Sequence, residues 1–162
     1  MTAADYNSCV DQYADSVYRF ILKNIKDEDK AHDIVQDSFV KMWIKRNNIE
    51  AKKAKSYLFT TAHHTMIDFL RKESRSGYIE ENNEYMDLQS SNQYSDLQEI
   101  LHDAVDLLPV IQKAVILLRD YEGYSYKEIA EITGLNEPQV KVYIYRARVF
   151  LRKYFGKLEV VI

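Results

Sequence analysis

One segment near the carboxyl end of the chain carries cations and no acidic side chain. The whole chain has a formal net charge of −3, yet residues 138–158 hold six basic residues and no carboxylate. These six are Lys141, Arg146, Arg148, Arg152, Lys153 and Lys157. Lysine and arginine bind phosphate oxygens, and arginine also donates two hydrogen bonds to a guanine edge. The segment therefore has the chemistry of a DNA-binding surface.

Helical periodicity gives this segment two faces. Steps of three and four residues predict one buried side, formed by Val140, Ile144, Ala147 and Leu151. The other side presents Gln139, Lys141, Val142, Tyr145, Arg146 and Arg148. Its apolar and aromatic side chains suit thymine methyl groups, while its cations suit phosphates and guanine edges. We interpret this segment as a recognition helix.

Capping residues predict how that helix and its neighbour begin and end. Ser125 and Glu128 have the spacing of a capping box, and Asn136 and Gln139 repeat that arrangement eleven residues later. Gly134 between them suits a left-handed helix C-terminus. Residues 123–148 are therefore predicted to form a helix-turn-helix. The alternative is an ordinary helical hairpin with a solvated basic face.

A second possible chemistry is metal-dependent hydrolysis. His64 and Asp68 lie one helical turn apart and His63 is adjacent, which would suit a metal-dependent nuclease. No further ligand has a suitable spacing, because His32 and His102 are isolated. The sequence also lacks a nucleophile–base pair, a glycine-rich phosphate loop and a Cys-x-x-Cys motif. We therefore expect no enzymatic activity, no cofactor and no metal.

Composition predicts the elements that position these side chains. The chain has 162 residues, 46% of them hydrophobic, with only 4 glycines and 2 prolines, which favours an all-helical protein. Its single cysteine, Cys9, cannot form an internal disulfide, and this fits a reducing compartment. No signal peptide or membrane span is evident. We expect a soluble, cytoplasmic protein without direct membrane insertion.

The charge distribution divides the chain into two domains. Residues 1–72 carry +2, residues 73–97 carry −5 and residues 98–162 are neutral. The acidic middle is rich in Glu, Asn, Ser and Gln and has little apolar periodicity. We predict a flexible acidic linker over 75–96 that joins small helical domains at 1–74 and 97–162.

Apolar stripes predict several helices in these domains. The strongest stripe comprises Ala31, Ile34, Val35, Ser38, Phe39, Met42 and Trp43. Other stripes predict helices over 10–21 and 57–72 in the first domain. In the second domain, one helix is predicted to stop before Pro109, and the next to end near Gly123.

Three motifs then resemble those of a known family. Residues 123–155 are similar to region 4 of bacterial extracytoplasmic-function (ECF) sigma factors of the sigma-70 family. The motif "DIVQDSFVKMW" resembles their region 2.2, and "SYLFTTAHHTMIDFLRK" resembles their regions 2.3 and 2.4. The motifs occur in the order of the family and together span most of the chain. The predicted domains would then be a region 2 bundle and a region 4 helix-turn-helix.

This resemblance implies a function in transcription initiation. Such proteins bind core RNA polymerase through its clamp and flap regions, direct it to promoters with particular −10 and −35 elements, and help open the DNA. An anti-sigma factor often controls them. A stand-alone helix-turn-helix regulator is the alternative, but it leaves the two motifs of the first half unexplained.

The resemblance also implies residue roles. Polymerase binding falls to Asp33, Gln36, Asp37 and Lys41; the first three project together on a helix, while Phe39 and Trp43 are expected in the core. Binding of the −10 element falls to Lys52, Lys53, Lys55, Ser56, Tyr57 and His64. Binding of the −35 element falls to Arg119, Lys141, Val142, Tyr145, Arg146 and Arg148. His64, Val142 and Tyr143 stand where the family commonly has Asn, Ser and Arg, and the loss of a basic residue at Tyr143 is expected to weaken phosphate attraction or to alter the −35 sequence that is read.

Overall fold

The computed structural model describes residues 1–76 and 93–161, and all regular elements in these ranges are helical. The first domain contains α1 (Ala3–Ile25), α2 (Glu28–Ile44) and α3 (Ala54–Ser76). Two short 3₁₀ turns, Arg46–Asn48 and Ala51–Lys53, join α2 to α3. Most of the predicted linker, 75–96, falls outside the described residues, so its bounds stay a prediction.

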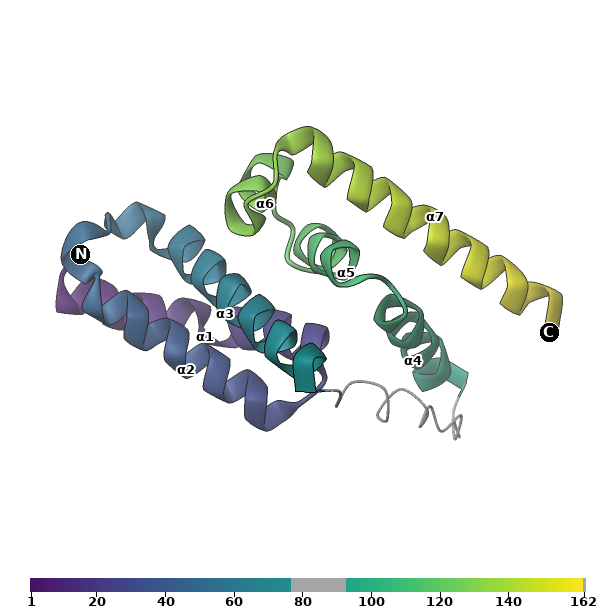
Figure 1. Ribbon diagram of the computed structural model, residues 1–162, viewed down its shortest axis with the longest axis horizontal. Helices are drawn as coiled ribbons and strands as arrows, with labels where there is room; N and C mark the ends of the chain where they lie inside the picture. Colours follow the sequence, from purple (N-terminus) through teal and green to yellow (C-terminus); the bar gives the residue numbers. More distant parts are fainter. Residues whose placement is uncertain (77–92, 162) are drawn as a thin grey trace.

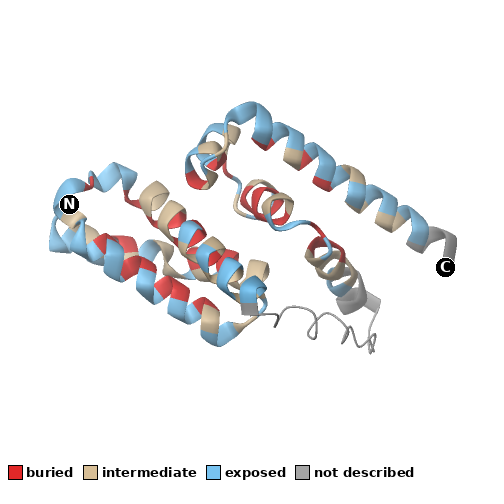
Figure 2. Ribbon diagram, viewed as in Figure 1, coloured by how far each residue is buried: buried red, intermediate tan, exposed pale blue. Residues whose placement is uncertain are grey.

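The first domain is a three-helix bundle in which α1, α2 and α3 pack along one another (Figure 1). Thr2 starts α1 with a capping box to Asp5, and Asp27 caps α2 by accepting a hydrogen bond from the backbone N–H of Lys30. The inward faces are buried, as Figure 2 shows, and the central side chains are Val17, Phe20, Ile21, Met42, Leu58, Phe59 and Met66. The stripes predicted from the sequence are confirmed in these helices.

One residue of the predicted stripe is not in the core. Trp43 is 38% exposed, so its assignment to the core was wrong. Its ring instead contacts Tyr6, with ring centroids 4.9 Å apart, and the Arg46 guanidinium lies 3.8 Å from the ring centroid. Trp43 lies in the last turn of α2, where Tyr6 and Arg46 pack against its ring.

The second domain contains α4 (Gln93–Asp106), α5 (Val110–Ile116), α6 (Tyr126–Thr133) and α7 (Glu137–Val161). Its helix-turn-helix is confirmed in detail. Ser125 and Glu128 form the predicted capping box, and Gly134 ends α6 with φ of 79°. Asn136 and Gln139 exchange the corresponding side-chain to backbone hydrogen bonds at the start of α7, at 2.8 and 3.0 Å.

A π-helical turn, Leu117–Tyr121, follows α5 and redirects the chain. Gly123 comes directly after it with φ of 75°, a value that glycine adopts without strain. This bend brings Glu122 and Tyr124 against the first domain, where Phe59 contacts the Tyr124 ring at a centroid distance of 5.2 Å. The two domains therefore share one continuous hydrophobic core, with α6 packed against α3.

Candidate nucleic-acid interface

The outer face of α7 presents four of the predicted DNA-contacting residues to solvent. Lys141 and Arg146 are exposed, Val142 is 45% exposed and Tyr145 is 69% exposed. Val140, Ile144 and Ala147 are buried on the opposite face, as the periodicity predicted. Large apolar side chains held in water at a capped helix start suit contact with the floor of a DNA groove.

The other two residues of this group already have partners within the domain. Arg148 forms an ion pair with Asp120 at 2.8 Å, and this pairing raises the pKa of Arg148. Arg119 donates a hydrogen bond to the carbonyl oxygen of Tyr124 at 2.8 Å, and its guanidinium lies 4.5 Å from the Tyr126 ring centroid. These contacts hold both guanidinium groups against other residues of the second domain.

The predicted polymerase-binding residues lie together on the outer face of α2. Asp33, Gln36 and Asp37 are all exposed, as the helical spacing predicted. Lys41 pairs with Asp37 at 3.1 Å and also donates a hydrogen bond to the Thr65 hydroxyl at 3.1 Å. Val40 and Ile44 are exposed beside them, which adds an apolar strip to the charged face.

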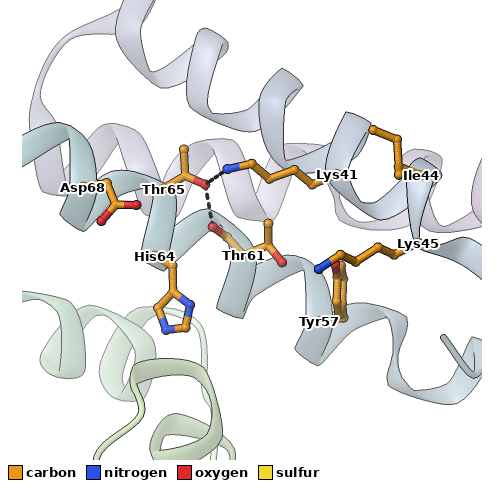
Figure 3. Close-up of a pocket in the computed structure, with 8 residues that line it drawn as sticks. All are labelled: Lys41, Ile44, Lys45, Tyr57, Thr61, His64, Thr65 and Asp68. Carbon is orange, nitrogen blue, oxygen red and sulfur yellow. Dashed lines mark hydrogen bonds between the residues drawn. The ribbon is translucent and has the colours of Figure 1, made fainter. Parts of the chain in front are cut away.

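A cavity of about 380 Å³ lies between α2 and α3, and Figure 3 shows its lining. Two predicted −10 residues, Tyr57 and His64, line it together with Lys41, Ile44, Lys45, Thr61, Thr65 and Asp68. The sequence prediction missed Lys45, Thr61 and Thr65. Residues 57, 61, 64, 65 and 68 recur at helical spacing, and this pattern marks one face of α3.

The basic residues before and within the start of α3 line a different cleft. Lys52, Lys53 and Ser56 border a space of about 710 Å³, and Tyr57 lies between this cleft and the cavity of Figure 3. Lys55 turns toward the second domain, with its ammonium 4.4 Å from the Tyr124 ring centroid. Five of the six predicted −10 residues therefore divide between two neighbouring spaces that share Tyr57 and Lys45, and Lys55 lines neither space.

His63 and His64 have different environments despite being adjacent. His64 is exposed, whereas the His63 ring is buried and its Nδ1 atom has no hydrogen-bond partner among the described residues. Burial, with a smaller contribution from His64, lowers the pKa of His63 to about 4. The two rings therefore lie in different surroundings. No group of three or more potential metal ligands occurs within residues 1–76 and 93–161.

No helix within residues 1–76 and 93–161 is both long enough and apolar enough to cross a bilayer.

Comparison with known proteins accounts for both halves of the chain. The family description "Sigma-70 region 2" matches residues 9–76, and "Sigma-70, region 4" matches residues 98–151. The RNA polymerase sigma factor SigV of Bacillus subtilis is 33% identical over 147 residues, which cover 90% of this chain and 87% of that protein. The ECF RNA polymerase sigma factor SigM of the same organism is 27% identical, over 90% of this chain and 91% of that protein.

The chain belongs to the ECF group of the sigma-70 family. It is a promoter-recognising sigma factor of RNA polymerase. The stand-alone regulator is not favoured, because the match to region 2 explains the motifs that such a regulator leaves without a role.

A solved structure resembles this sigma factor over both domains. The sigma factor RpoE of Bartonella quintana, crystallised with the anti-sigma factor NepR, superposes with a TM-score of 0.76 at 25% sequence identity. The match covers 94% of this chain and 97% of that one. Both domains therefore contribute to a single superposition.

Proposed function

We propose that the outer face of α7 contacts the −35 element of the promoter. The exposed row of Lys141, Val142, Tyr145 and Arg146 on a doubly capped helix carries this assignment. Arg146 and Lys141 donate hydrogen bonds to guanine edges or phosphates, and Val142 and Tyr145 contact thymine methyl groups. Arg119 and Arg148 bind phosphates on either side, which adds affinity without base preference.

The first domain binds the −10 element after its strands separate. An unstacked base needs a pocket with an aromatic wall and polar groups, and the cavity of Figure 3 provides Tyr57, His64 and Lys45. Lys52, Lys53 and Ser56 line the neighbouring cleft, which also includes Tyr57, and together with Lys55 they bind the backbone of the same strand.

The outer face of α2 binds the clamp of core RNA polymerase. Its carboxylates, Asp33 and Asp37, form ion pairs with basic residues of the clamp helices, and Val40 and Ile44 give the contact an apolar part. The second domain binds the flap region. These are binding roles that involve no catalysis. They would be carried out in the cytoplasm, which contains both the polymerase and the chromosome.

An anti-sigma factor is a further proposed partner. The RpoE structure of Bartonella quintana contains such a partner, and it matches this chain over both domains. We expect a corresponding protein to bind here and to block the polymerase-binding face.

In vitro transcription tests the whole proposal. The protein is mixed with core RNA polymerase and a promoter library randomised at the −35 and −10 positions, and the transcribed sequences are determined. We expect two enriched motifs at the spacing of promoter elements. Tyr145→Ala should change the −35 motif only, and His64→Ala should change the −10 motif only. Transcripts without any enriched motif, or a −10 change caused by Tyr145→Ala, would contradict the assignments.

A further inference from the structure

Five side chains from three segments form one cluster beside the exposed face of α7. Arg119 and Asp120 come from the π-helical turn that follows α5, Tyr126 is the first residue of α6, and Lys141 and Arg148 lie on α7. We call this group the Tyr126 cluster. It brings together three cations, one carboxylate and one aromatic ring. A π-helical turn within a helical segment often marks a functional position, and here it carries two of the five members.

The ring of Tyr126 contacts two of the cations. The Arg119 guanidinium lies 4.5 Å from the ring centroid, and the Lys141 ammonium lies 5.5 Å from it. Cations are attracted to the electron-rich face of an aromatic ring at such distances. Arg119 also donates one hydrogen bond to the carbonyl oxygen of Tyr124. A guanidinium has five N–H donors, so these contacts order Arg119 and still leave it donors for phosphate oxygens.

Arg148 is held by an acid rather than by the ring face. Its guanidinium pairs with the Asp120 carboxylate at 2.8 Å, and the two side chains are 45% and 43% exposed. Asp120 raises the pKa of Arg148, and the nearby Tyr126 hydroxyl contributes in the same direction. A carboxylate and a phosphate accept hydrogen bonds from the same guanidinium donors, so Asp120 occupies groups that a DNA phosphate needs. An exposed ion pair adds little stability, and a phosphate can therefore replace this carboxylate.

We propose that Tyr126 is a positioning residue for the −35 face, and that Asp120 competes with the DNA phosphate for Arg148. This inference rests on the proposed phosphate-binding role of Arg119 and Arg148. Tyr126 orders Arg119 and Lys141 before DNA binds, which reduces the entropy lost on binding and increases the affinity. Asp120 has to release Arg148, which decreases the affinity. Both effects act through contacts with the DNA backbone, so they change the affinity for all −35 sequences alike.

A purely structural role of the ion pair predicts a different result when Asp120 is replaced. If the pair only held the π-helical turn against α7, its loss would leave Arg148 less ordered, and DNA binding would be unchanged or weaker. If Asp120 competes with a phosphate, its loss frees Arg148 and DNA binding becomes tighter. The direction of the change in DNA affinity therefore separates the two roles.

Holoenzyme binding to a labelled duplex tests the proposal. The duplex contains the selected −35 element and ends before the −10 element, and fluorescence anisotropy measures the affinity over a series of NaCl concentrations. The first set of variants is Asp120→Asn, Arg148→Ala and the double variant. Glu99→Gln, at an exposed position of α4, is the control for the loss of one negative charge. Circular dichroism verifies that each variant is folded.

We expect Asp120→Asn to bind every −35 sequence roughly two- to fivefold more tightly, because one exposed ion pair no longer has to break. Arg148→Ala should bind more weakly, and its plot of log affinity against log salt concentration should be shallower by about 0.9, the value for one phosphate contact. Asp120→Asn should give no gain when Arg148 is already alanine. Glu99→Gln should bind as the wild type does.

A second set of variants tests the ring. Tyr126→Leu keeps an apolar side chain at this position but removes the electron-rich face, and we expect roughly three- to tenfold weaker binding of every −35 sequence. The preferred −35 motif should stay the same. Tyr126→Phe keeps the ring and loses only the hydroxyl, so it should retain most of the affinity of the wild type.

Three results would overturn the proposal: no tightening by Asp120→Asn, the same tightening in the Arg148→Ala background, or wild-type affinity of a folded Tyr126→Leu variant. The proposed −35 role of α7 is judged separately, by the effect of Tyr145→Ala on the −35 motif. A motif that changes with Tyr145→Ala while Asp120→Asn and Tyr126→Leu have no effect contradicts the cluster alone. A motif that no α7 variant changes contradicts the −35 role, and with it the role of the cluster.

Discussion

The two proposed DNA-binding faces of this sigma factor differ in accessibility. On α7, Tyr145 is 69% exposed and Val142 is 45% exposed, so the −35 face is open to solvent. At the start of α3, Ser56 and Lys55 contact Glu131 and Tyr124 of the other domain, so part of the −10 face is covered. One proposed face is open to solvent, while the other is partly in contact with the second domain.

This difference explains how a chain of net charge −3 can carry a basic recognition helix and still depend on polymerase. The −35 face alone buries a small area and gains from few phosphates, so its affinity is weak at physiological salt. The proposed −10 face binds separated strands, so it adds no affinity for the duplex until the strands part. We expect polymerase to bring the strands apart, so that the two faces act together.

The largest effect is expected from a substitution on the proposed polymerase-binding face of α2, and it is a loss of affinity for core polymerase. This face lies in the same domain as the proposed −10 site. Asp37→Arg should weaken binding to core polymerase on the order of 100-fold or more, because it replaces attraction to a basic clamp with repulsion. The measurement is a competition titration for core polymerase. Asp11→Arg, at an exposed position of α1, is the matched control. Unchanged binding by a folded Asp37→Arg variant would refute the clamp assignment.

Acid should destabilise the first domain through His63. The folded-state pKa of His63 is about 4, below the ordinary histidine value of 6.5, so the stabilisation is complete above pH 6.5 and declines as the pH falls toward 4. Between pH 7 and pH 5 the unfolded chain takes up a proton on this ring while the folded chain does not, and this should lower the free energy of unfolding by about 2 kcal/mol. Urea titrations at several pH values measure this slope.

The matched pair for that experiment is His63→Gln and His64→Gln. Removing the buried ring should flatten the slope between pH 7 and pH 5, whereas removing the exposed ring should leave it as in the wild type. Equal slopes for the wild type and His63→Gln would show that the burial of His63 does not control acid stability.

The exposed face of α7 should discriminate bases without any opening step. Arg146→Ala should cost about 1–3 kcal/mol of binding at one −35 position and relax the preference there. Arg152→Ala, further along the same helix, should weaken all sequences evenly if it contacts phosphates. Holoenzyme binding to a panel of −35 variants separates the two patterns. An equal loss of affinity for all sequences with Arg146→Ala would show that Arg146 contacts the DNA backbone and not a base.

The smallest effect is expected from salt on the free chain. The Arg19 side chain is 49% exposed, so added salt screens its pairing with Glu122 and favours separation of the domains. The radius of gyration should increase slightly between about 0.1 and 1 M NaCl, where the Debye length falls from about 10 to about 3 Å. A radius of gyration that does not change would show that the Phe59–Tyr124 contact holds the two domains together without help from the ion pair.

Local signals predicted much of this structure. The caps at Ser125 and Asn136 are hydrogen bonds between residues three positions apart, and both are present as predicted. Periodicity identified the buried faces of α2 and α7, but α3 runs from Ala54 to Ser76 rather than over 57–72. Trp43 was misplaced because periodicity predicts a direction and does not predict which neighbour covers a helix end.

Capping pairs and helical periodicity did not predict the contact between the domains. Arg19 and Glu122 are 103 residues apart, and nothing within a few residues of either one marks it as half of a pair. The burial of Lys113 is equally invisible, since a lysine in a helix is normally predicted to be exposed. These features depend on how two separately predictable units fit together, which short-range patterns do not contain.

The most direct test of the account compares promoter binding by the free chain and by the holoenzyme. A duplex with both selected elements is titrated with each at the same salt concentration, and variants lacking the −10 or the −35 element are titrated in parallel. The account predicts weak binding by the chain alone and tight binding by the holoenzyme that depends on both elements. Equally tight binding by the chain alone would contradict it, and would indicate a stand-alone regulator.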